Sequence, residues 1–390
     1  MEIIAISIFW SVIFLLGYHY AGYFFILKLL AKNKKPNQVK YTSEDSLPTV
    51  AVVFAAYNEE KVIAQKIEHT FNTTYPPDKL QVWIGSDNST DDTHKIVQQY
   101  QRQYPNLHLR IFSQRTGKAQ IINQLVENIQ ADILILTDAN ILFTPTHIFN
   151  LVAHFKNSDI GLVGGNITNN KVLQQGISEQ ETAYIHFENK IKCYEGLLGC
   201  MIGAFGASYA IRKELYVPVP KGFISDDFFI SMQVLAQGKK AIFELNALGF
   251  ETFSTKITEE FRRKARYAVG NFQNLFYFTN FWKKPFSNVF FCYFSHKVLR
   301  WFLPLLMVLA AVCLIVLATK SKFYLILASL ALLICILIGL DIALFKEKAG
   351  FKPLRFLSHF LAMNAALLLG FFRYLFTKPQ TVWKPTERIS

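Results

Sequence analysis

The sequence predicts an α/β domain with a mostly parallel sheet, flanked on both sides in the chain by transmembrane helices. Apolar runs of strand length alternate with helical stretches between residues 49 and 137, an order typical of parallel sheets with crossover helices. Polar and acidic residues directly follow several of these runs. Long apolar segments lie at both ends of the 390-residue chain, whose apolar fraction is 52 %.

The N-terminal segment, residues 1–30, is expected to be a transmembrane helix. Residues 3–30 are nearly all apolar, and about 20 such residues suffice to span a bilayer. Glu2 precedes them, and four lysines lie at or beyond their end: Lys28, Lys32, Lys34 and Lys35. A secretory signal peptide has the opposite charge order. The positive-inside rule therefore predicts an anchor that starts outside and ends in the cytoplasm.

Residues 31–47 are expected to form a polar linker, and residues 48–285 a cytoplasmic domain that includes interfacial helices near 259–285. The continuous apolar run Thr49–Ala56 suits a strand that is buried on both faces. A helical stretch is expected from Tyr57 toward Phe71. Further strands are expected at Leu80–Gly85, Leu107–Phe112, Asp132–Thr137 and Gly161–Gly165, with helices after the first three. The second half of the domain is less periodic and is expected to be mixed.

Residues 286–390 are predicted to form a second membrane region with spans near 301–318, 323–345 and 356–376. The last segment contains His359, Asn364 and Arg373, which must face protein or an interface. The loop Lys346–Lys352 is basic, as a cytoplasmic loop should be. Strict alternation would place the tail outside although it is also basic. The last segment is therefore either a full span or an interfacial or re-entrant segment.

The net charge of +13 is compatible with nucleic acid or with an anionic surface as a partner. Much of the excess flanks the apolar segments, where it would meet anionic lipid, and the sequence contains no nucleic-acid module. Membrane lipids and phosphate-bearing ligands are therefore expected, and nucleic acid is not. Among the five cysteines, Cys193 and Cys200 could pair, but a cytoplasmic domain keeps its thiols reduced. Free thiols are expected.

Polar signals at the ends of predicted strands mark a candidate site. Ser86–Asp91 follows one strand and Thr137–Asn140 follows another, and open α/β sheets bind ligands at the carboxyl ends of their strands. Asp138 and Asn140 supply the hard oxygen ligands that Mg²⁺ and Mn²⁺ prefer. A surface turn would explain Asp138–Asn140 taken alone, but the presence of Asp87 favours a metal held through Asp138 and a diphosphate.

Two further signals follow, Asp226–Asp227 and Arg263–Tyr267. In order and spacing the four signals resemble the family-2 glycosyltransferases, the group that includes the hyaluronan, chitin and poly-N-acetylglucosamine synthases. The resemblance covers roughly residues 48–280 and the layout of flanking spans. It implies a GT-A type, Rossmann-like nucleotide-sugar-binding domain at the plasma membrane. The implied reaction is inverting transfer from a UDP-sugar, with N-acetylglucosamine as the leading candidate, to a growing polysaccharide or lipid-linked glycan.

The resemblance assigns donor-binding roles to individual residues. Asp87 matches the nucleotide-binding Asp of a segment that commonly reads Asp-Asp-Gly-Ser-x-Asp, with Ser and Asn replacing the first Asp and the Gly here. Lys118 fits a cation that contacts phosphate or base. Ordinary turn and cap chemistry is the alternative for such polar clusters, and it is the expectation for Asp91 and Thr93. The end of the first strand, where base and ribose bind, is matched by Ala56, Tyr57 and Glu59.

The acidic pair Asp226–Asp227 resembles the family's Glu-Asp or Asp-Asp pair, whose second acid is the catalytic base. Asp227 is therefore expected to take the proton of the acceptor, beside Asp226. Neighbouring acids in a cleft separate into roles because each one shifts the other's pKa. A helix N-terminus capped by Ser225 is the structural alternative, and it is compatible with the catalytic role.

Arg263–Tyr267 occupies the position of the Gln-x-x-Arg-Trp signature of processive synthases, with Arg and Tyr at its ends. Arg263, Arg266 and Tyr267 are placed at the donor, where Arg266 would neutralise the leaving diphosphate. A basic helix lying on the membrane is the competing interpretation. The partial match leaves processivity open.

A non-processive transferase that adds one sugar to a lipid is therefore the alternative function, and a non-catalytic export subunit is the less favoured one. The intact set Asp87, Asp138 and Asp227 argues against a non-catalytic role. Because four spans are few for a translocation channel, a homodimer or a partner subunit is considered as well.

Overall fold

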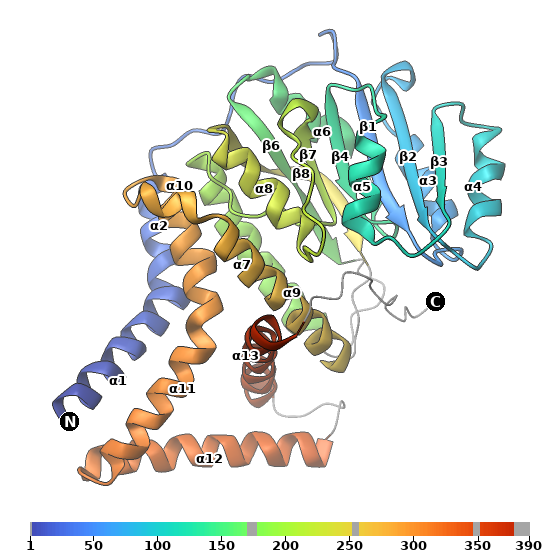
Figure 1. Ribbon diagram of the computed structural model, residues 1–390. Helices are drawn as coiled ribbons and strands as arrows, with labels where there is room; N and C mark the ends of the chain where they lie inside the picture. Colours follow the sequence, from blue (N-terminus) through green and yellow to red (C-terminus); the bar gives the residue numbers. More distant parts are fainter. Residues whose placement is uncertain (1, 170–177, 252–256, 346–351, 378–390) are drawn as a thin grey trace.

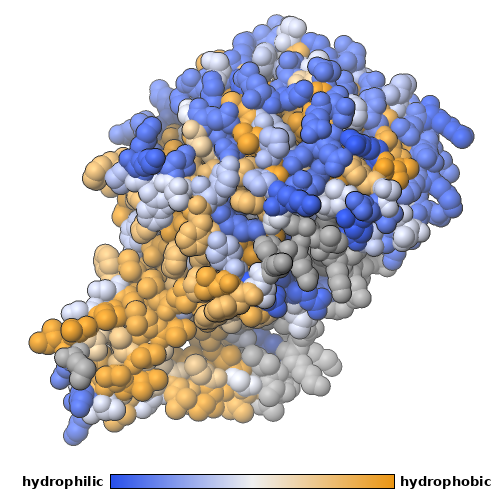
Figure 2. All heavy atoms as spheres, in the orientation of Figure 1, coloured by the Kyte–Doolittle hydropathy of each residue, from blue (hydrophilic) through white to orange (hydrophobic). Residues whose placement is uncertain are grey.

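The computed structural model describes residues 2–169, 178–251, 257–345 and 352–377. An α/β domain occupies one side of the molecule, and long apolar helices extend from it on the other side (Figure 1). On the face shown in Figure 2, hydrophilic residues predominate over the α/β domain and hydrophobic residues predominate over the helices.

One eight-stranded sheet organises the domain, in the order β3-β2-β1-β4-β7-β6-β8-β5. Strands β3, β2, β1 and β4 are parallel, β7 is antiparallel to both of its neighbours, and β6 is parallel to β8. The strands are β1 (Val50–Ala56), β2 (Leu80–Asp87), β3 (Leu107–Phe112), β4 (Ile133–Thr137), β5 (Leu142–Phe143), β6 (Ile160–Asn169), β7 (Ser208–Arg212) and β8 (Lys240–Glu251). Since β1, β2, β4 and β8 run in one direction, their carboxyl ends meet at one edge.

Helices cover both faces of the sheet, and each face has its own apolar core. One face carries α3 (Ile63–Phe71), α4 (Thr93–Gln101) and α6 (His147–Val152). The other carries α5 (Lys118–Val126), α7 (Ser178–Leu197) and α8 (Asp226–Ala236). Every residue of β1 is buried, because this central strand lies between two strands and two helical layers. The prediction of a mostly parallel α/β sheet is confirmed.

The helix expected after Tyr57 begins only at Ile63. The intervening loop is held by the neighbouring loop after β2: the backbone N–H of Glu59 donates to Thr93 Oγ1 at 2.9 Å. The N–H of Glu60 donates to Asp91 Oδ2 at 3.0 Å. These side chains give the backbone N–H groups partners outside a helix, so residues 57–62 form bends and a turn before α3 begins.

Within the described residues, four helical segments are long and apolar enough to cross a membrane: Glu2–Ala31, Asn288–Ala318, Lys322–Asp341 and Pro353–Phe376. They comprise α1 (Glu2–Gly17), η1 (Tyr18–Gly22), α2 (Tyr23–Ala31), α10 (Asn288–Cys292), η7 (Tyr293–Val298), α11 (Leu299–Ala318), α12 (Lys322–Phe345) and α13 (Lys352–Phe376). The segment expected at 301–318 starts earlier than predicted, because α10 and η7 run into α11. The predicted basic loop (346–351) and the tail from residue 378 lie outside the described residues.

A buried polar cluster joins the first apolar helix to the α/β domain. Glu195 of α7 accepts a hydrogen bond from the Tyr23 hydroxyl at 2.8 Å, and His296 Nδ1 lies 2.7 Å from the same oxygen. Glu188, also on α7, pairs with His296 at 3.1 Å and with Lys297 at 2.5 Å. We call Tyr23, Glu188, Glu195, His296 and Lys297 the Glu195 cluster. It ties α2, α7 and η7 together, so His296 has a structural role in this cluster.

The cysteines are free thiols, as expected. All five are unpaired, including Cys193 and Cys200. Cys200 instead lies 3.5 Å from Cys292, sulfur to sulfur, as a buried thiol–thiol contact between the α/β domain and α10.

Candidate active site

Asp87 ends β2 as a fully buried carboxylate that holds the next loop. Its oxygens accept hydrogen bonds from Arg115 Nε at 3.1 Å, from the Thr116 N–H at 2.5 Å and from the Gly117 N–H at 3.2 Å. The Arg115 guanidinium lies over the Tyr57 ring, 3.3 Å from its centroid. Asp87 therefore fixes a stacked Arg115–Tyr57 pair at the ends of β1 and β2. The sequence placed Asp87 at this site but did not predict this role.

The loop after β1 carries the other predicted donor residues. Ala56 is buried at the end of the strand, and Asn58 follows with a φ of 53°. Its Oδ1 accepts a hydrogen bond from the Thr90 N–H at 2.8 Å, which joins this loop to the one after β2. Thr93 Oγ1 donates to Asp91 Oδ1 at 2.6 Å, so Asp91 and Thr93 have the local structural role expected of them. Tyr57 and Glu59 thus lie in a loop that is held by hydrogen bonds to the loop after β2.

Lys118 links two of the predicted acidic signals. It begins α5 directly after Gly117, whose φ of 88° turns the chain toward the sheet edge. Its Nζ lies 2.7 Å from Asp138 Oδ1 and 3.8 Å from Asp226 Oδ2. Although burial opposes its charge, these carboxylates raise the pKa of Lys118 above its ordinary value. The site therefore contains a permanent cation between the end of β4 and the start of α8.

Asp138 and Asn140 were expected to hold a metal ion. Asn140 Nδ2 donates to Glu251 Oε1 at 3.3 Å, and Glu251 ends β8 at the same sheet edge. Within the described residues no group of three or more His, Cys, Asp or Glu side chains could hold a metal. The residues present nonetheless fit Mg²⁺ or Mn²⁺, since carboxylate and amide oxygens are hard ligands and a diphosphate can complete the shell. Such an ion would be coordinated jointly by these side chains and by the diphosphate of a bound ligand.

Asp226 and Asp227 start α8, as predicted. Burial, together with the neighbouring Asp226 carboxylate, raises the pKa of Asp227 to about 6. A Cβ on Gly206 would lie 2.8 Å from Asp227 Oδ2, so only a glycine leaves this carboxylate room. An acid with a pKa near neutrality is suited to accept a proton during a reaction and release it afterwards.

Lys192 binds the loop of residues 202–206, which lies beside Asp227. This buried side chain donates to the carbonyl oxygens of Gly203 and Ile202, and its ammonium lies 4.6 Å from the centre of the Phe205 ring. Burial, reinforced by the nearby Lys297 charge, lowers the pKa of Lys192 to about 8. The sequence analysis missed this residue, because an isolated Lys within a long helix carries no motif.

The expectation that the Ser225 side chain caps α8 is wrong. Ser225 stands at the N-cap position without a side-chain cap hydrogen bond. Its side chain faces Gly270 of α9 (Ile257–Tyr277), where an added Cβ would lie 2.3 Å from Ser225 Oγ. Gln273 of α9 donates to the Gly222 carbonyl at 2.7 Å and accepts from the Ile224 N–H at 3.1 Å. Helix α9 therefore holds the loop that leads into the acidic pair.

The predicted donor residues of α9 fall into two groups. Arg263 lies 2.6 Å from Glu260, whose buried carboxylate also pairs with Lys264 at 3.4 Å. This pairing engages Arg263 within its own helix. Arg266 precedes Gly270 by one helical turn and therefore shares its face, and Tyr267 is half-exposed. The opposite side of α9 packs on α13, where a Cβ on Gly370 would lie 2.2 Å from Ala268 Cβ.

Comparison with known proteins places this geometry in context. Residues 51–215 match the profile of "Glycosyl transferase family 2". Over 131 residues the chain is 34 % identical to the beta-monoglucosyldiacylglycerol synthase of Nostoc sp. (strain PCC 7120), a match that covers 33 % of this chain and 28 % of that enzyme. A dolichyl N-acetyl-alpha-D-glucosaminyl phosphate 3-beta-D-2,3-diacetamido-2,3-dideoxy-beta-D-glucuronosyltransferase of Methanococcus voltae is 25 % identical over 92 residues, 23 % of this chain and 29 % of that one. The chain thus matches less than a third of the length of each relative.

Among solved structures, the mannosyltransferase PcManGT of Pyrobaculum calidifontis, determined with GDP-Man and Mn²⁺, has a TM-score of 0.70 at 22 % identity. The match covers 95 % of this chain and 99 % of PcManGT. The likeness therefore includes the apolar helices as well as the α/β domain, and the prediction of a GT-A fold is confirmed.

Proposed function

Residues 51–215 form a glycosyl transferase family 2 domain, and on this premise we propose that the chain transfers a sugar from a nucleotide-diphosphate sugar to a lipid acceptor. The observation that carries the proposal is a continuous line of contacts across the site. Asp138 pairs with Lys118, Lys118 approaches Asp226, and burial together with the neighbouring Asp226 raises the pKa of Asp227. Groups suited to a diphosphate and a group suited to a proton therefore lie side by side.

In the proposed reaction Asp227 accepts the proton of the acceptor hydroxyl as its oxygen attacks the anomeric carbon. The bond from that carbon to the diphosphate breaks on the opposite side, so the anomeric configuration inverts and the nucleoside diphosphate leaves with the bonding electrons. Lys118 and Arg266 offset the charge that develops on the leaving group. Mg²⁺ or Mn²⁺, when bound through Asp138 and Asn140, would neutralise the same diphosphate.

The acceptor is proposed to be a lipid or a lipid-linked glycan that receives a single sugar. Two observations support a lipid acceptor over a growing free polymer. The matched relatives carry names with diacylglycerol and dolichyl phosphate acceptors. The helix that holds the acidic pair, α9, also packs against α13, a candidate membrane span. A UDP-sugar is kept as the proposed donor, at the cytoplasmic face of the cell membrane.

The test uses the full chain, purified in detergent and returned to nanodiscs. UDP- and GDP-linked sugars are supplied with diacylglycerol or a polyprenyl phosphate, and both nucleoside diphosphate release and the glycolipid product are measured. Product from one donor–acceptor pair, absent with Asp227→Asn, is expected. A chain that binds nucleotide sugars by calorimetry yet glycosylates no lipid would contradict the lipid acceptor. Release of long polymer instead would support the processive alternative.

A further inference from the structure

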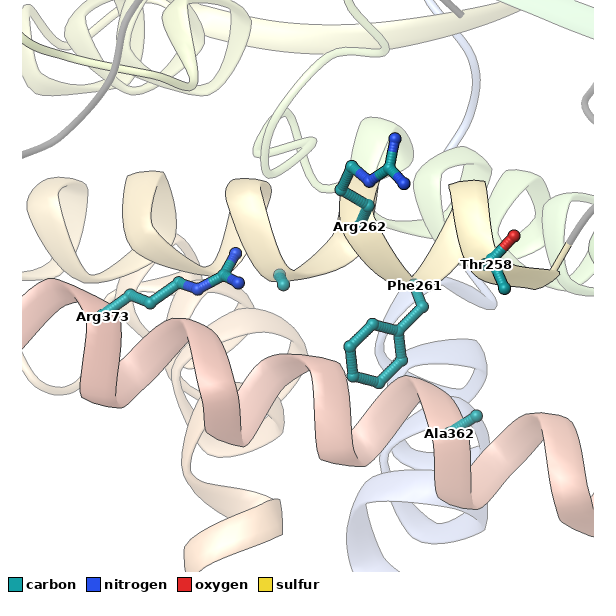
Figure 3. A pocket seen from close by; sticks show the side chains of 6 residues that line it. Thr258, Phe261, Arg262, Ala362 and Arg373 are labelled. Atoms are coloured by element: carbon teal, nitrogen blue, oxygen red, sulfur yellow. The ribbon is translucent and has the colours of Figure 1, made fainter. Parts of the chain in front are cut away.

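A hollow of about 390 Å³ separates part of α9 from α13 (Figure 3). In this view the Phe261 ring points from α9 toward α13, while Arg373 extends from α13 toward α9. On α9 the hollow lies about one and a half to three helical turns before Gly270, away from the contacts that hold the acidic pair. Its lining residues are Thr258, Phe261, Arg262, Ala265, Ala362 and Arg373.

The hollow exists because small and large side chains alternate along the contact of the two helices. At Gly370 the helices approach closely, since an added Cβ would lie 2.6 Å from the Ala265 carbonyl oxygen. Two turns earlier on α13, Ala362 is too short to reach α9, and Phe261 fills only part of the space. The short side chains of Ala265 and Ala362 therefore leave an open-sided space beside this close contact.

The hollow contains two positive charges without a counterion in the described part of the chain. Arg262 and Arg373 are exposed, and neither forms an ion pair there. Glu260, on the same helical turn as Arg262, is already engaged by Arg263 and Lys264. An arginine that reaches across an apolar hollow, with a second arginine at its rim, favours an anion that also has an apolar part.

We propose that this hollow binds the headgroup of an anionic membrane lipid. The phosphate would pair with Arg373, which extends toward α9, and the glycerol and first acyl carbons would contact Phe261, Ala265 and Ala362. Arg262 lines the hollow from its rim, since its side chain leaves α9 on the side away from α13 (Figure 3), and it would add positive charge there. A lipid fits better than a soluble anion, because α13 is itself a candidate membrane span and the wall is apolar. The volume falls within the range of pockets that hold small ligands, about 300 to 1,000 Å³.

The bound lipid would join α9 to α13 at the end where their direct contact is open. Because α9 also holds Gly222 and Ile224 before the acidic pair, we expect the lipid to stabilise the position of that loop. The site thus differs from the catalytic groups and does not depend on any transferase activity.

The experiment measures lipid retention by the full chain in the absence of nucleotide sugar. Protein in detergent is mixed with phosphatidylglycerol or phosphatidylcholine, and bound lipid is counted by native mass spectrometry alongside the thermal midpoint. Preferential retention of phosphatidylglycerol is expected, weakened at least tenfold in Arg262→Ala/Arg373→Ala and restored in Arg262→Lys/Arg373→Lys. The matched control is Lys283→Ala/Lys284→Ala, which removes the same charge after α9 but outside the hollow.

If the test and control variants lost equal amounts of bound phosphatidylglycerol, net charge alone would explain the retention, and the proposed site would be overturned. Equal retention of both lipids, or an identical stabilisation by inorganic phosphate alone, would overturn the lipid assignment. Arg262→Gln, an exposed change on α9 that leaves α13 intact, is measured in parallel in case the double variant misfolds. Since no sugar transfer is measured, failure of the transferase proposal leaves this result unaffected.

Discussion

Gly270 of α9 lies against Ser225 so closely that a single added Cβ would stand 2.3 Å from the Ser225 hydroxyl oxygen and 2.9 Å from its backbone nitrogen. Ser225 is the residue directly before Asp226 and Asp227. Helix α9 also bonds to Gly222 and Ile224 through Gln273. The position of the acidic pair is therefore set by a helix that itself rests on a candidate membrane span.

Gly270→Ala should lower the turnover number with only a modest loss of stability. The methyl group must displace Ser225, and overpacking of this kind costs about 1–3 kcal/mol. Gly339→Ala on α12 is the matched control, because an added Cβ there meets nothing within 4 Å. Steady-state kinetics and thermal midpoints check both variants. Unchanged turnover in Gly270→Ala would show that the contact does not position the pair.

Asp227→Asn should retain donor binding and lose transfer by about 10²–10⁴-fold, the usual contribution of a general base. The amide keeps the size of the side chain but cannot accept the acceptor's proton. Calorimetry with the donor, beside a product assay, separates binding from transfer. If Asp226→Asn were the inactive variant and Asp227→Asn were active, the roles of the two acids would be reversed.

The pH dependence of kcat/KM should show an acid limb near pH 6. Asp227 must be ionised to accept a proton, and burial together with Asp226 raises its pKa to about 6, so the rate falls as the pH drops through that value. Asp226→Asn removes one of these two causes and should move the limb to lower pH. A limb that stays in place in this variant would argue that another group titrates.

Transfer should require Mg²⁺ or Mn²⁺ held through Asp138. Asp138→Ala should abolish both turnover and the binding of Mn²⁺ in the presence of nucleoside diphosphate, followed by the paramagnetic resonance signal of the free ion. Asn140→Asp should keep or increase the affinity for Mn²⁺, because it replaces a neutral oxygen ligand by a charged one. Full wild-type activity in excess chelator would show that transfer does not require a metal ion.

The catalytic domain should face the cytoplasm. In a variant without native thiols, single cysteines at Asn37, Lys348 and Ser390 are exposed to an impermeant reagent in intact cells. Protection at Asn37 and Lys348 is expected from the lysines that follow the first apolar segment. Labelling of Ser390 alone would indicate four full spans, and protection of all three would make α13 interfacial or re-entrant. Labelling at Asn37 would reverse the orientation.

The parts of the site that follow strands could be predicted from the sequence. The apolar runs of β1 and β4 and the polar residues after them are local signals, and the edge of a parallel sheet brings such ends together. Lys118 was identified as a cation of the site, but its position between Asp138 and Asp226 depends on how α5 and α8 pack.

The remaining contacts depend on residues far apart in the chain. Glu251 bonds to Asn140 across 111 positions, and Gly270 meets Ser225 through the packing of two helices. A glycine in an amphipathic helix and a Glu at a strand end carry no motif that distinguishes them from ordinary surface residues. Likewise, the antiparallel β7 could not be read from a short run of mixed residues, because its direction is fixed by its neighbours.

The Glu195 cluster has a practical consequence for anyone who wishes to cut this protein into parts. A fragment beginning after α2 would remove the Tyr23 hydroxyl from a fully buried carboxylate, and an unmade hydrogen bond of this kind costs about 1–3 kcal/mol. It would also uncover the apolar side of α7 on which α2 packs. The C-terminal part of the first apolar helix, α2, thus packs as part of the catalytic domain's core. Cleavage in the linker should yield an unstable, aggregating fragment and no working soluble enzyme.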